Sequence, residues 1–288
     1  MDYRTRLYRS VLYMPASNER ALEKARELPV DAVIFDFEDA VAPDVKPDAR
    51  KTLKAALARG GYGPRMRIVR VNGLDTEWGR ADAEAVRDME TDAILLPKVD
   101  SPEKIDELAA ITGELPIWAM METPRGMLNA SAIAAHPKVA GLVMGTNDLT
   151  SEMNARFRPD RRPLRTALDL CLLAAKSEGR IIVDGVYNSY RDTDGLATEC
   201  AQGRDMGFDG KTLIHPAQVE VANRIFAPSS GEIDLARRQI AAFEEAQKRG
   251  QGLAVVDGQI VENLHVATAL KTLAKAAAIE ARQAERTS

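Results

Sequence analysis

Short apolar runs alternate with amphipathic segments along most of the chain, and this alternation predicts repeated strand–helix units. The apolar runs are rich in Val, Ile, Leu and Phe, which is typical of strands buried on both faces. The predicted strands cover residues 10–14, 32–37, 67–71, 93–97, 116–121, 140–144, 181–183 and 211–214. The predicted helices cover residues 20–27, 47–59, 80–90, 102–112, 126–135, 163–177, 194–206 and 216–226. Strict alternation of the two kinds of element predicts a parallel sheet.

Eight such units predict a closed (β/α)8 barrel, the TIM barrel, for which about 250 residues is typical. The alternative is an open doubly wound sheet. It is disfavoured because no GxGxxG motif follows the first strand, where the chain reads MPASN. We therefore expect an α/β fold with residues 1–228 forming a catalytic barrel domain.

The pattern changes after residue 226, and residues 229–288 are predicted to form a C-terminal extension for a lid or for oligomerisation. A helix is expected at residues 233–248 and a second, Ala-rich helix at residues 264–282. Between them, residues 254–261 predict a hairpin with Asp-Gly at its turn.

Two acids, Glu122 and Asp148, each follow an apolar strand run and stand 26 residues apart, about one strand-plus-helix unit. If the two strands are parallel neighbours, both carboxylates emerge on one rim of the barrel. Two converging carboxylates, with room for water and substrate oxygens, are how an enzyme holds Mg²⁺. The alternative is helix capping, for which Thr123 and Asn147 are also available. We favour metal binding.

Most other predicted strand ends also carry ionisable groups, as expected for a barrel with its active site at that end. Glu38 and Asp39 follow an apolar strand and are expected to face a metal ion or its waters rather than form a surface turn. Arg70 lies within a strand pattern and requires an anionic partner, either the metal acids or a substrate carboxylate. Asn147 is a further candidate for substrate contact. Lys98 is interpreted as structural rather than as a Schiff-base lysine.

Composition narrows the class of function. The net charge of −4 argues against nucleic-acid binding. No stretch approaches the roughly 18 apolar residues of a membrane span, and the N-terminus lacks a signal peptide, so we expect a cytoplasmic protein. Two cysteines, Cys171 and Cys200, lie in helical patterns and are expected to be buried thiols. Three scattered histidines make a zinc site improbable.

Several longer motifs occur in an order that resembles a known family. They are RSVLYMP at 9–15, FDFEDAVAP at 35–43, RVNG at 70–73, LPKV at 96–99, ETP at 122–124, GTNDL at 145–149, GFDGKTLIHP at 207–216 and VDGQIV at 256–261. On these motifs the chain resembles the citrate lyase β-subunit and malyl-CoA lyase group of the HpcH/HpaI aldolase superfamily.

The resemblance implies a TIM barrel that uses Mg²⁺, with Mn²⁺ able to substitute, and a CoA thioester as substrate. Carried over by position, Glu122 and Asp148 match the metal ligands, and Arg70 matches the arginine that binds the substrate carboxylate. The same matching places Asp39 near the metal's water shell. The residues matched to the CoA pyrophosphate region are Lys24 and the loop from Pro15 to Ser17.

The tail hairpin matches a lid that closes over a neighbouring subunit's active site, so a homotrimer or homohexamer is expected. After this hairpin, Glu262 stands where many relatives carry an aspartate that is a candidate general acid/base. Asn18 stands where some relatives carry an arginine.

The expected reaction is Mg²⁺-dependent carbon–carbon cleavage of a 3-hydroxy-dicarboxylyl-CoA thioester, of the malyl-CoA, citramalyl-CoA or methylmalyl-CoA type. Such a retro-Claisen lyase would release a 2-oxoacid and an acyl-CoA, with Arg70 clamping the substrate carboxylate bidentately. The alternatives are a (3S)-malyl-CoA thioesterase on the same scaffold, a citrate lyase β-subunit, a CoA-independent 2-oxoacid aldolase and a non-catalytic binding protein.

Overall fold

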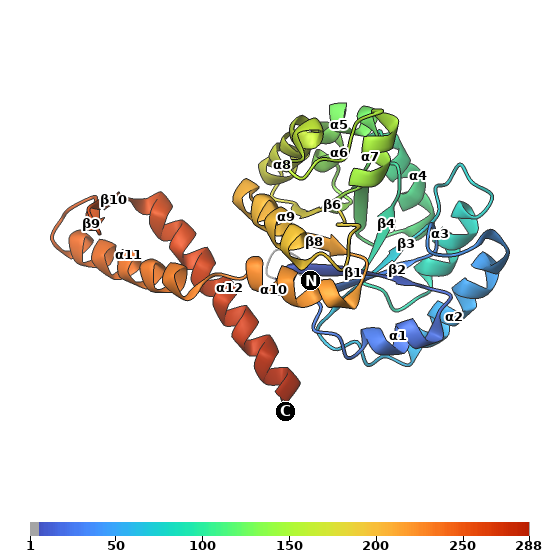
Figure 1. Cartoon of the computed structure of the whole chain (residues 1–288), viewed down its shortest axis with the longest axis horizontal. Helices are drawn as coiled ribbons and strands as arrows, with labels where there is room; N and C mark the ends of the chain where they lie inside the picture. The colour runs from blue at the N-terminus through green and yellow to red at the C-terminus, as the bar shows by residue number, and fades with distance from the viewer. Residues whose placement is uncertain (1–5, 288) are drawn as a thin grey trace. The chain divides into compact units, whose positions relative to one another are not determined.

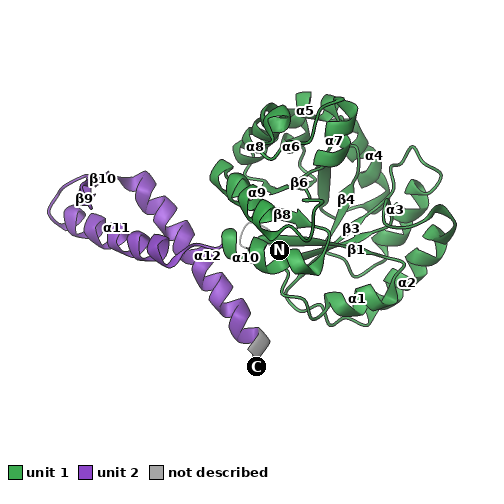
Figure 2. Cartoon of the chain, in the orientation of Figure 1, with its two compact units in different colours: residues 1–226 green, residues 227–288 purple. Residues whose placement is uncertain are grey.

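The chain divides into two compact units. The structure is a computed structural model that describes residues 6–287. Unit 1 spans Met1–Phe226 and unit 2 spans Ala227–Ser288 (Figure 2). The boundary predicted from the sequence lies two residues later, after residue 228.

Unit 1 is a closed barrel of eight parallel strands, in which each strand pairs with the next along the chain and β8 closes against β1 (Figure 1). The strands are β1 (Ser10–Pro15), β2 (Ala32–Asp36), β3 (Met66–Arg70), β4 (Ala93–Leu96), β5 (Ile117–Met121), β6 (Val139–Met144), β7 (Ile181–Asp184) and β8 (Gly210–Leu213). Each predicted strand is present with ends within one residue of the prediction. The predicted (β/α)8 barrel is therefore confirmed.

Helices surround the barrel (Figure 1). They are α1 (Glu19–Ala25), α2 (Lys46–Ala58), α3 (Gly79–Arg87), α4 (Pro102–Thr112), α5 (Pro124–Leu128), α6 (Ala130–Ala135), α7 (Thr146–Glu152), α8 (Arg165–Ser177), α9 (Thr193–Met206) and α10 (Val219–Ile225). Most match a predicted helix, so strand–helix alternation was a sound guide to the order of elements.

Two helical details differ from the prediction. The single helix expected at residues 126–135 is split at Asn129, which caps the end of α5 while its side-chain amide donates to the Asp100 carbonyl oxygen at 2.7 Å. The short helix α7 was not predicted, because its sequence TNDLTSE is almost wholly polar. It begins at Thr146, immediately after the residue that follows β6, and therefore carries Asp148 in its first turn.

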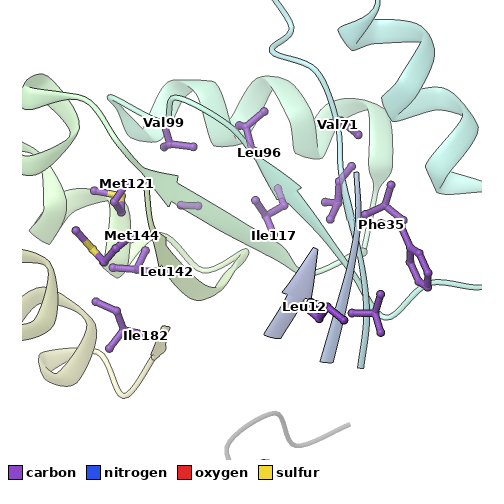
Figure 3. Packing of buried hydrophobic residues seen from close by; sticks show 14 of the residues in the cluster. Leu12, Phe35, Val71, Leu96, Val99, Ile117, Met121, Leu142, Met144 and Ile182 are labelled. Carbon is purple, nitrogen blue, oxygen red and sulfur yellow. The ribbon is translucent and has the colours of Figure 1, made fainter. Parts of the chain in front are cut away.

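Alternate strand residues build two separate apolar layers, as the two-residue period of a strand requires. Residues such as Leu12 and Phe35 face outward and pack with the helices (Figure 3). Their neighbours Val11 and Ile34 belong to a second cluster made of barrel residues alone, in which Trp118 is the largest side chain. The barrel interior is thus a packed core, and only its carboxyl end is left for chemistry.

Unit 2 is a helix–hairpin–helix structure. It consists of α11 (Ser230–Lys248), the antiparallel pair β9 (Ala254–Val256) and β10 (Gln259–Val261), and α12 (Asn263–Thr287). Asp257 and Gly258 form the predicted turn with φ of +50° and +77°. Arg238 on α11 holds the Asp257 carboxylate at 2.7 and 2.8 Å. The role of this unit as a lid or oligomerisation element stays a prediction.

None of the described helices is long and apolar enough to cross a membrane. Cys171 and Cys200 are free and buried, as the sequence predicted. Burial raises the pKa of each thiol to about 12, so neither is ionised near neutral pH.

Candidate active site

A cavity of about 320 Å³ opens at the carboxyl ends of the strands. Its walls come from the ends of β1, β2, β3, β5 and β6 and from the loops that follow β7 and β8. The lining residues are Tyr13, Pro15, Asp36, Asp39, Ala40, Arg70, Met120, Met144, Gly145, Thr146, Asn147, Asp148, Val186 and Ile214. Barrel enzymes carry their catalytic residues at this end, so the cavity is the candidate active site.

Glu122 follows β5 directly and is only 1% exposed. Its Oε1 accepts the backbone N–H of Lys98 at 2.7 Å. Lys98 has φ of +49°, a left-handed conformation that residues with side chains seldom adopt and that is often found at functional sites. The side chain of Lys98 is exposed, so this lysine orients Glu122 through its backbone.

Burial and neighbouring carboxyl groups make ionisation of Glu122 and of Glu38 costly. Burial, followed by the charges of Glu38 and Asp148, raises the pKa of Glu122 to about 8. Burial is also the main cause that raises the pKa of Glu38 to about 7, while Arg70 opposes that shift. A bound cation would stabilise the ionised forms, because its charge offsets both the desolvation and the mutual repulsion.

The donor set fits Mg²⁺. Magnesium is usually held by one or two carboxylates, with waters and substrate oxygens completing six positions. Glu122 and Asp148 would form such a pair, and Asp148 is near enough to Glu122 to contribute to its raised pKa. Within residues 6–287, no group of three or more His, Cys, Asp or Glu side chains is placed to hold a metal. A site with few protein ligands leaves room for a substrate to coordinate, unlike a closed zinc site.

Arg70 is held in place by acids of β2 and the loop after it. Its Nε and Nη2 each donate to an Asp36 carboxylate oxygen at 2.7 Å. Asp36 and Arg70 are direct partners in the register of β2 and β3. Nη1 lies 2.6 Å from Glu38 Oε2 and 3.3 Å from Asp39 Oδ2. The bidentate edge that was expected to clamp a substrate carboxylate is therefore occupied by Asp36, and Nη1 is shared among Glu38, Asp39 and the Met120 sulfur.

A buried lysine fixes the loop that carries Glu38. The Nζ of Lys46 donates to the carbonyl oxygens of Phe37 and Glu38 at 2.8 and 2.7 Å. It also donates to Asn72 Oδ1 at 2.9 Å. The Asn72 amide in turn donates to Asp82 at 2.6 Å. This network presets the backbone at Glu38, so the carboxyl group needs little reorganisation when a ligand binds.

The fold brings most of the predicted site residues to this one cavity. Pro15, Asp39, Arg70, Asn147 and Asp148 line it. Glu122 lies beside it, because a Cβ added at the lining residue Gly145 would fall 2.5 Å from Glu122 Oε2. The roles of these residues toward a metal or substrate stay predictions.

Three other predicted residues are not among those that line this cavity. Ser17 and Lys24 are not among the residues that line the cavity, and Lys24 is exposed in the last turn of α1. Asn18 rather than Ser17 caps α1, with its side chain accepting the Ala21 N–H at 3.1 Å. Glu262 belongs to unit 2, where its backbone N–H donates to His265 Nδ1 at 3.0 Å. Their predicted contacts with CoA or with a proton therefore remain untested.

Sequence reasoning missed two side chains of the site. Asp36, the partner of Arg70, could have been predicted, because an acid at the end of an apolar strand requires a cationic neighbour. Nothing in the sequence indicated a role for Tyr13 in the site, since an aromatic residue in a strand is usually part of the core. Its ring lies against Arg70, with the guanidinium carbon 5.0 Å from the ring centroid.

A second cavity of about 410 Å³ shares Thr146, Asn147 and Val186 with the first. One of its walls contains Arg161, which donates through Nη1 to both oxygens of Asp184 at 2.8 and 2.7 Å. Asp184 is fully buried and also accepts from Lys211, so it is a neutralised structural acid although it ends a barrel strand. Its pKa is lowered chiefly by Lys211 and Arg161, which outweigh burial.

A parallel eight-stranded barrel with paired acids and a buried arginine at the carboxyl ends of its strands defines the class of (β/α)8-barrel enzymes. Within that class the chain belongs to the HpcH/HpaI aldolase/citrate lyase family, which residues 9–216 match.

Characterised relatives place the chain more finely within the family. It is 63% identical over 281 residues to the "(3S)-malyl-CoA thioesterase" of Cereibacter sphaeroides strain KD131, covering 98% of this chain and 99% of that protein. It is 33% identical to the "Citrate lyase subunit beta" of Escherichia coli K12, covering 95% and 94% of the two chains. These relatives are enzymes, and the sequence prediction of an enzyme of this family is confirmed.

A solved structure agrees with the fold over nearly the whole chain. The protein CitE from Mycobacterium tuberculosis, in complex with magnesium, acetoacetate and coenzyme A, superimposes with a TM-score of 0.81 at 30% identity. The match covers 95% of this chain and 99% of that one. The relatives favour the thioesterase that the sequence analysis held as an alternative over the lyase that it put first.

Proposed function

We propose that this chain is a Mg²⁺-dependent (3S)-malyl-CoA thioesterase, which hydrolyses the thioester to free malate and CoA. The observation that carries the proposal is one cavity lined by Asp148 and the anchored Arg70, with Glu122 beside it and Glu38 in contact with Arg70. The 63% identity to a protein of that name supports the choice of substrate and of hydrolysis.

Glu122 and Asp148 would hold the metal ion. When bound there, Mg²⁺ supplies a Lewis acid for the oxygens of the malyl group. The protein itself holds both carboxylates in place. Glu122 is oriented by the Lys98 N–H, and Asp148 is carried by the first turn of α7.

Arg70 and Glu38 would act on the substrate and on water. Nη1 of Arg70 would bind the substrate in place of its 3.3 Å contact with the exposed Asp39, while Asp36 prevents the guanidinium from turning. Glu38, with a pKa of about 7, is suited to accept a proton from the attacking water near neutral pH. Asp39 is 73% exposed in its side chain and would contact the outer waters of the metal ion.

CoA would approach along the carboxyl end of β1, where Pro15 lines the cavity and where Ser17 and Lys24 follow in sequence. The acyl group of the thioester would then lie near Arg70. Asn147, which exchanges two hydrogen bonds with Asn188 at 3.1 and 2.9 Å, would border the acyl group on the β6 side.

We further propose that the chain forms a homotrimer or homohexamer in which unit 2 serves a neighbouring copy. Support comes from large apolar side chains left exposed on the hairpin, with Val255 61% and Ile260 57% exposed. Glu262 follows this hairpin directly and would contribute an acid/base group.

Carbon–carbon cleavage is the second candidate, because the relatives at 32–34% identity are citrate lyase β subunits. One experiment separates the two activities. Purified protein is incubated with Mg²⁺ and malyl-, citramalyl- or citryl-CoA, and free thiol and 2-oxoacid are followed separately. Thiol without oxoacid indicates the thioesterase, and oxoacid without thiol indicates the lyase. Absence of both products with all three esters would refute both functions.

The Glu122→Gln variant is the matched control for that assay. It keeps the size of the side chain and removes its charge, so metal-dependent turnover is expected to disappear. Turnover that persists in this variant at the wild-type rate would show that the reaction is not centred on the proposed metal pair.

A further inference from the structure

Tyr13 presents a weakly bound hydroxyl donor to the candidate active site. It lies in β1, lines the 320 Å³ cavity and has a partly buried ring. Its hydroxyl donates to the Met120 sulfur at 3.8 Å. No oxygen or nitrogen acceptor for this hydroxyl occurs within residues 6–287. A thioether is a weak acceptor, so the phenol retains most of its capacity to bind an oxygen atom.

A second donor converges on the same point. Nη1 of Arg70 lies 3.9 Å from the same Met120 sulfur. Its guanidinium stacks on the Tyr13 ring at 5.0 Å and is fixed by two 2.7 Å hydrogen bonds to Asp36. Nη1 also lies 2.6 Å from Glu38 Oε2 and donates to the exposed Asp39 at 3.3 Å, so an oxygen atom bound at the Met120 sulfur would take the place of the long Asp39 contact. Two donors that converge on one position are the arrangement that stabilises an oxygen atom as it becomes negative.

The position of Tyr13 suggests which oxygen this is. Tyr13 belongs to β1, two residues before Pro15 on the side where CoA would approach, and its hydroxyl reaches across to Met120 of β5, two residues before Glu122. In malyl-CoA, the thioester carbonyl joins the malyl group to the CoA sulfur. This carbonyl would therefore pass Tyr13 and Arg70, while the far carboxylate of the malyl group would lie nearer the metal pair.

We propose that the Tyr13 hydroxyl is a catalytic hydrogen-bond donor which, together with Arg70 Nη1, stabilises the thioester carbonyl oxygen during hydrolysis. This inference rests on the proposed thioesterase function. A water oxygen adds to the carbonyl carbon, the C=O π pair moves onto the oxygen, and Glu38 takes the proton of the water. When the C=O bond re-forms, the C–S bond breaks and the CoA thiolate leaves and is protonated, which gives malate and CoA.

The chemistry of the phenol supports this role. Burial raises the pKa of Tyr13 well above its usual value, and nearby acids add to the shift while Arg70 opposes it. The hydroxyl therefore stays protonated, as a donor must, throughout the pH range in which the enzyme would be assayed.

The test compares Tyr13→Phe with Tyr62→Phe. Tyr62 is a matched control, because its hydroxyl also makes one hydrogen bond, to the Leu22 carbonyl at 3.3 Å, and its ring also lies under an arginine, Arg26, at 5.1 Å. Tyr62 is not among the residues that line the cavity. Loss of one donor of this kind typically lowers kcat about 100- to 1,000-fold. We expect such a fall in kcat for Tyr13→Phe, with an unchanged melting temperature and little change in KM.

Tyr62→Phe is expected to lower the melting temperature and to leave kcat unchanged. A Tyr13→Phe variant whose kcat stays within about threefold of a hydrolytically active wild type would overturn the proposal. A wild type without hydrolysis would instead refute the proposed function, so the two failures are distinguishable. Incorporation of 3,5-difluorotyrosine at position 13 keeps the ring and the hydroxyl but strengthens the donor. An unchanged kcat in that protein would also overturn the proposal.

Discussion

Replacing Gly145 by alanine tests whether the position of the Glu122 carboxylate controls activity. Gly145 follows β6, and its backbone N–H donates to the Met121 carbonyl oxygen at 2.8 Å. A Cβ at this position would lie 2.4 Å from Glu122 Cβ and 2.5 Å from its Oε2. Unstrained contacts between carbon atoms are about 3.5 Å or longer, so Glu122 would have to move by about 1 Å. Because its Cβ is fixed to the backbone, the chain at the end of β5 or of β6 would have to shift with it.

A displacement of that size predicts a large functional effect. Misplacing a catalytic group by about 1 Å can cost about 100-fold in rate. We expect kcat/KM for malyl-CoA to fall by that factor and the half-saturating Mg²⁺ concentration to rise. The backbone itself accepts alanine, because Gly145 has φ of −96°. Overpacking is expected to lower the free energy of unfolding by about 1–3 kcal/mol, which leaves the barrel folded.

Steady-state thiol release at several Mg²⁺ concentrations, combined with urea unfolding, checks the prediction. Gly231→Ala is the control, because an added Cβ at that position of α11 meets no atom within 4 Å. It should behave like the wild type. A folded Gly145→Ala protein with kcat/KM within about threefold of the wild type would refute the inferred link between Gly145 and the metal pair.

Three further predictions concern stability and assembly. The pKa values of Glu122 and Glu38 are raised to about 8 and about 7, so the native metal-free protein binds more protons than the unfolded chain. Its melting temperature should therefore fall as pH rises from about 5 to 8, and Mg²⁺ should restore more stability at pH 8 than at pH 6. Lys211→Met should lower the free energy of unfolding by about 3–5 kcal/mol, because Lys211 is fully buried and pairs with Asp184 at 3.1 Å and Glu199 at 2.6 Å. Ile260→Asp should reduce the molar mass measured by light scattering without changing the circular dichroism spectrum.

Each of these predictions has a contradicting result. A melting temperature that is constant between pH 5 and 8 would contradict the raised pKa values. As a control, Glu122→Gln removes one of the two titrating groups and should make the melting temperature depend less on pH. Urea unfolding of Lys211→Met at the wild-type midpoint would show that its ion pairs do not stabilise the native state. An unchanged molar mass for Ile260→Asp, at a concentration where the wild type is oligomeric, would exclude the hairpin from the interface.

The elements of the barrel were predictable because they depend on local pattern. Strands buried on both faces are continuous apolar runs, and the runs of this chain are separated by helical segments with clear caps or prolines. The polar helix α7 lacked that pattern and was missed. Its position depends on Thr146 following β6 after a single residue, which a sequence pattern does not reveal.

Glu122 and Asp148 could be named as a pair before the structure was known, because parallel neighbouring strands end at the same rim. The partners of Arg70 could not be predicted in the same way. An arginine in a strand requires an acid, but the choice of Asp36 follows from the register of β2 and β3, in which the two residues face each other. That register is set by closure of the whole barrel.

The sequence by itself determined the order of strands and helices, the barrel, the family and the residues at the strand ends, because each of these follows from local hydrophobic pattern or from motifs in order. Only the tertiary structure decided which of those residues are free for chemistry. It paired Arg70 with Asp36, neutralised Asp184 with Lys211 and Arg161, and brought the Tyr13 hydroxyl to a sulfur 107 residues away. Such contacts depend on side-chain direction and strand register, which are fixed only when distant segments close into one barrel.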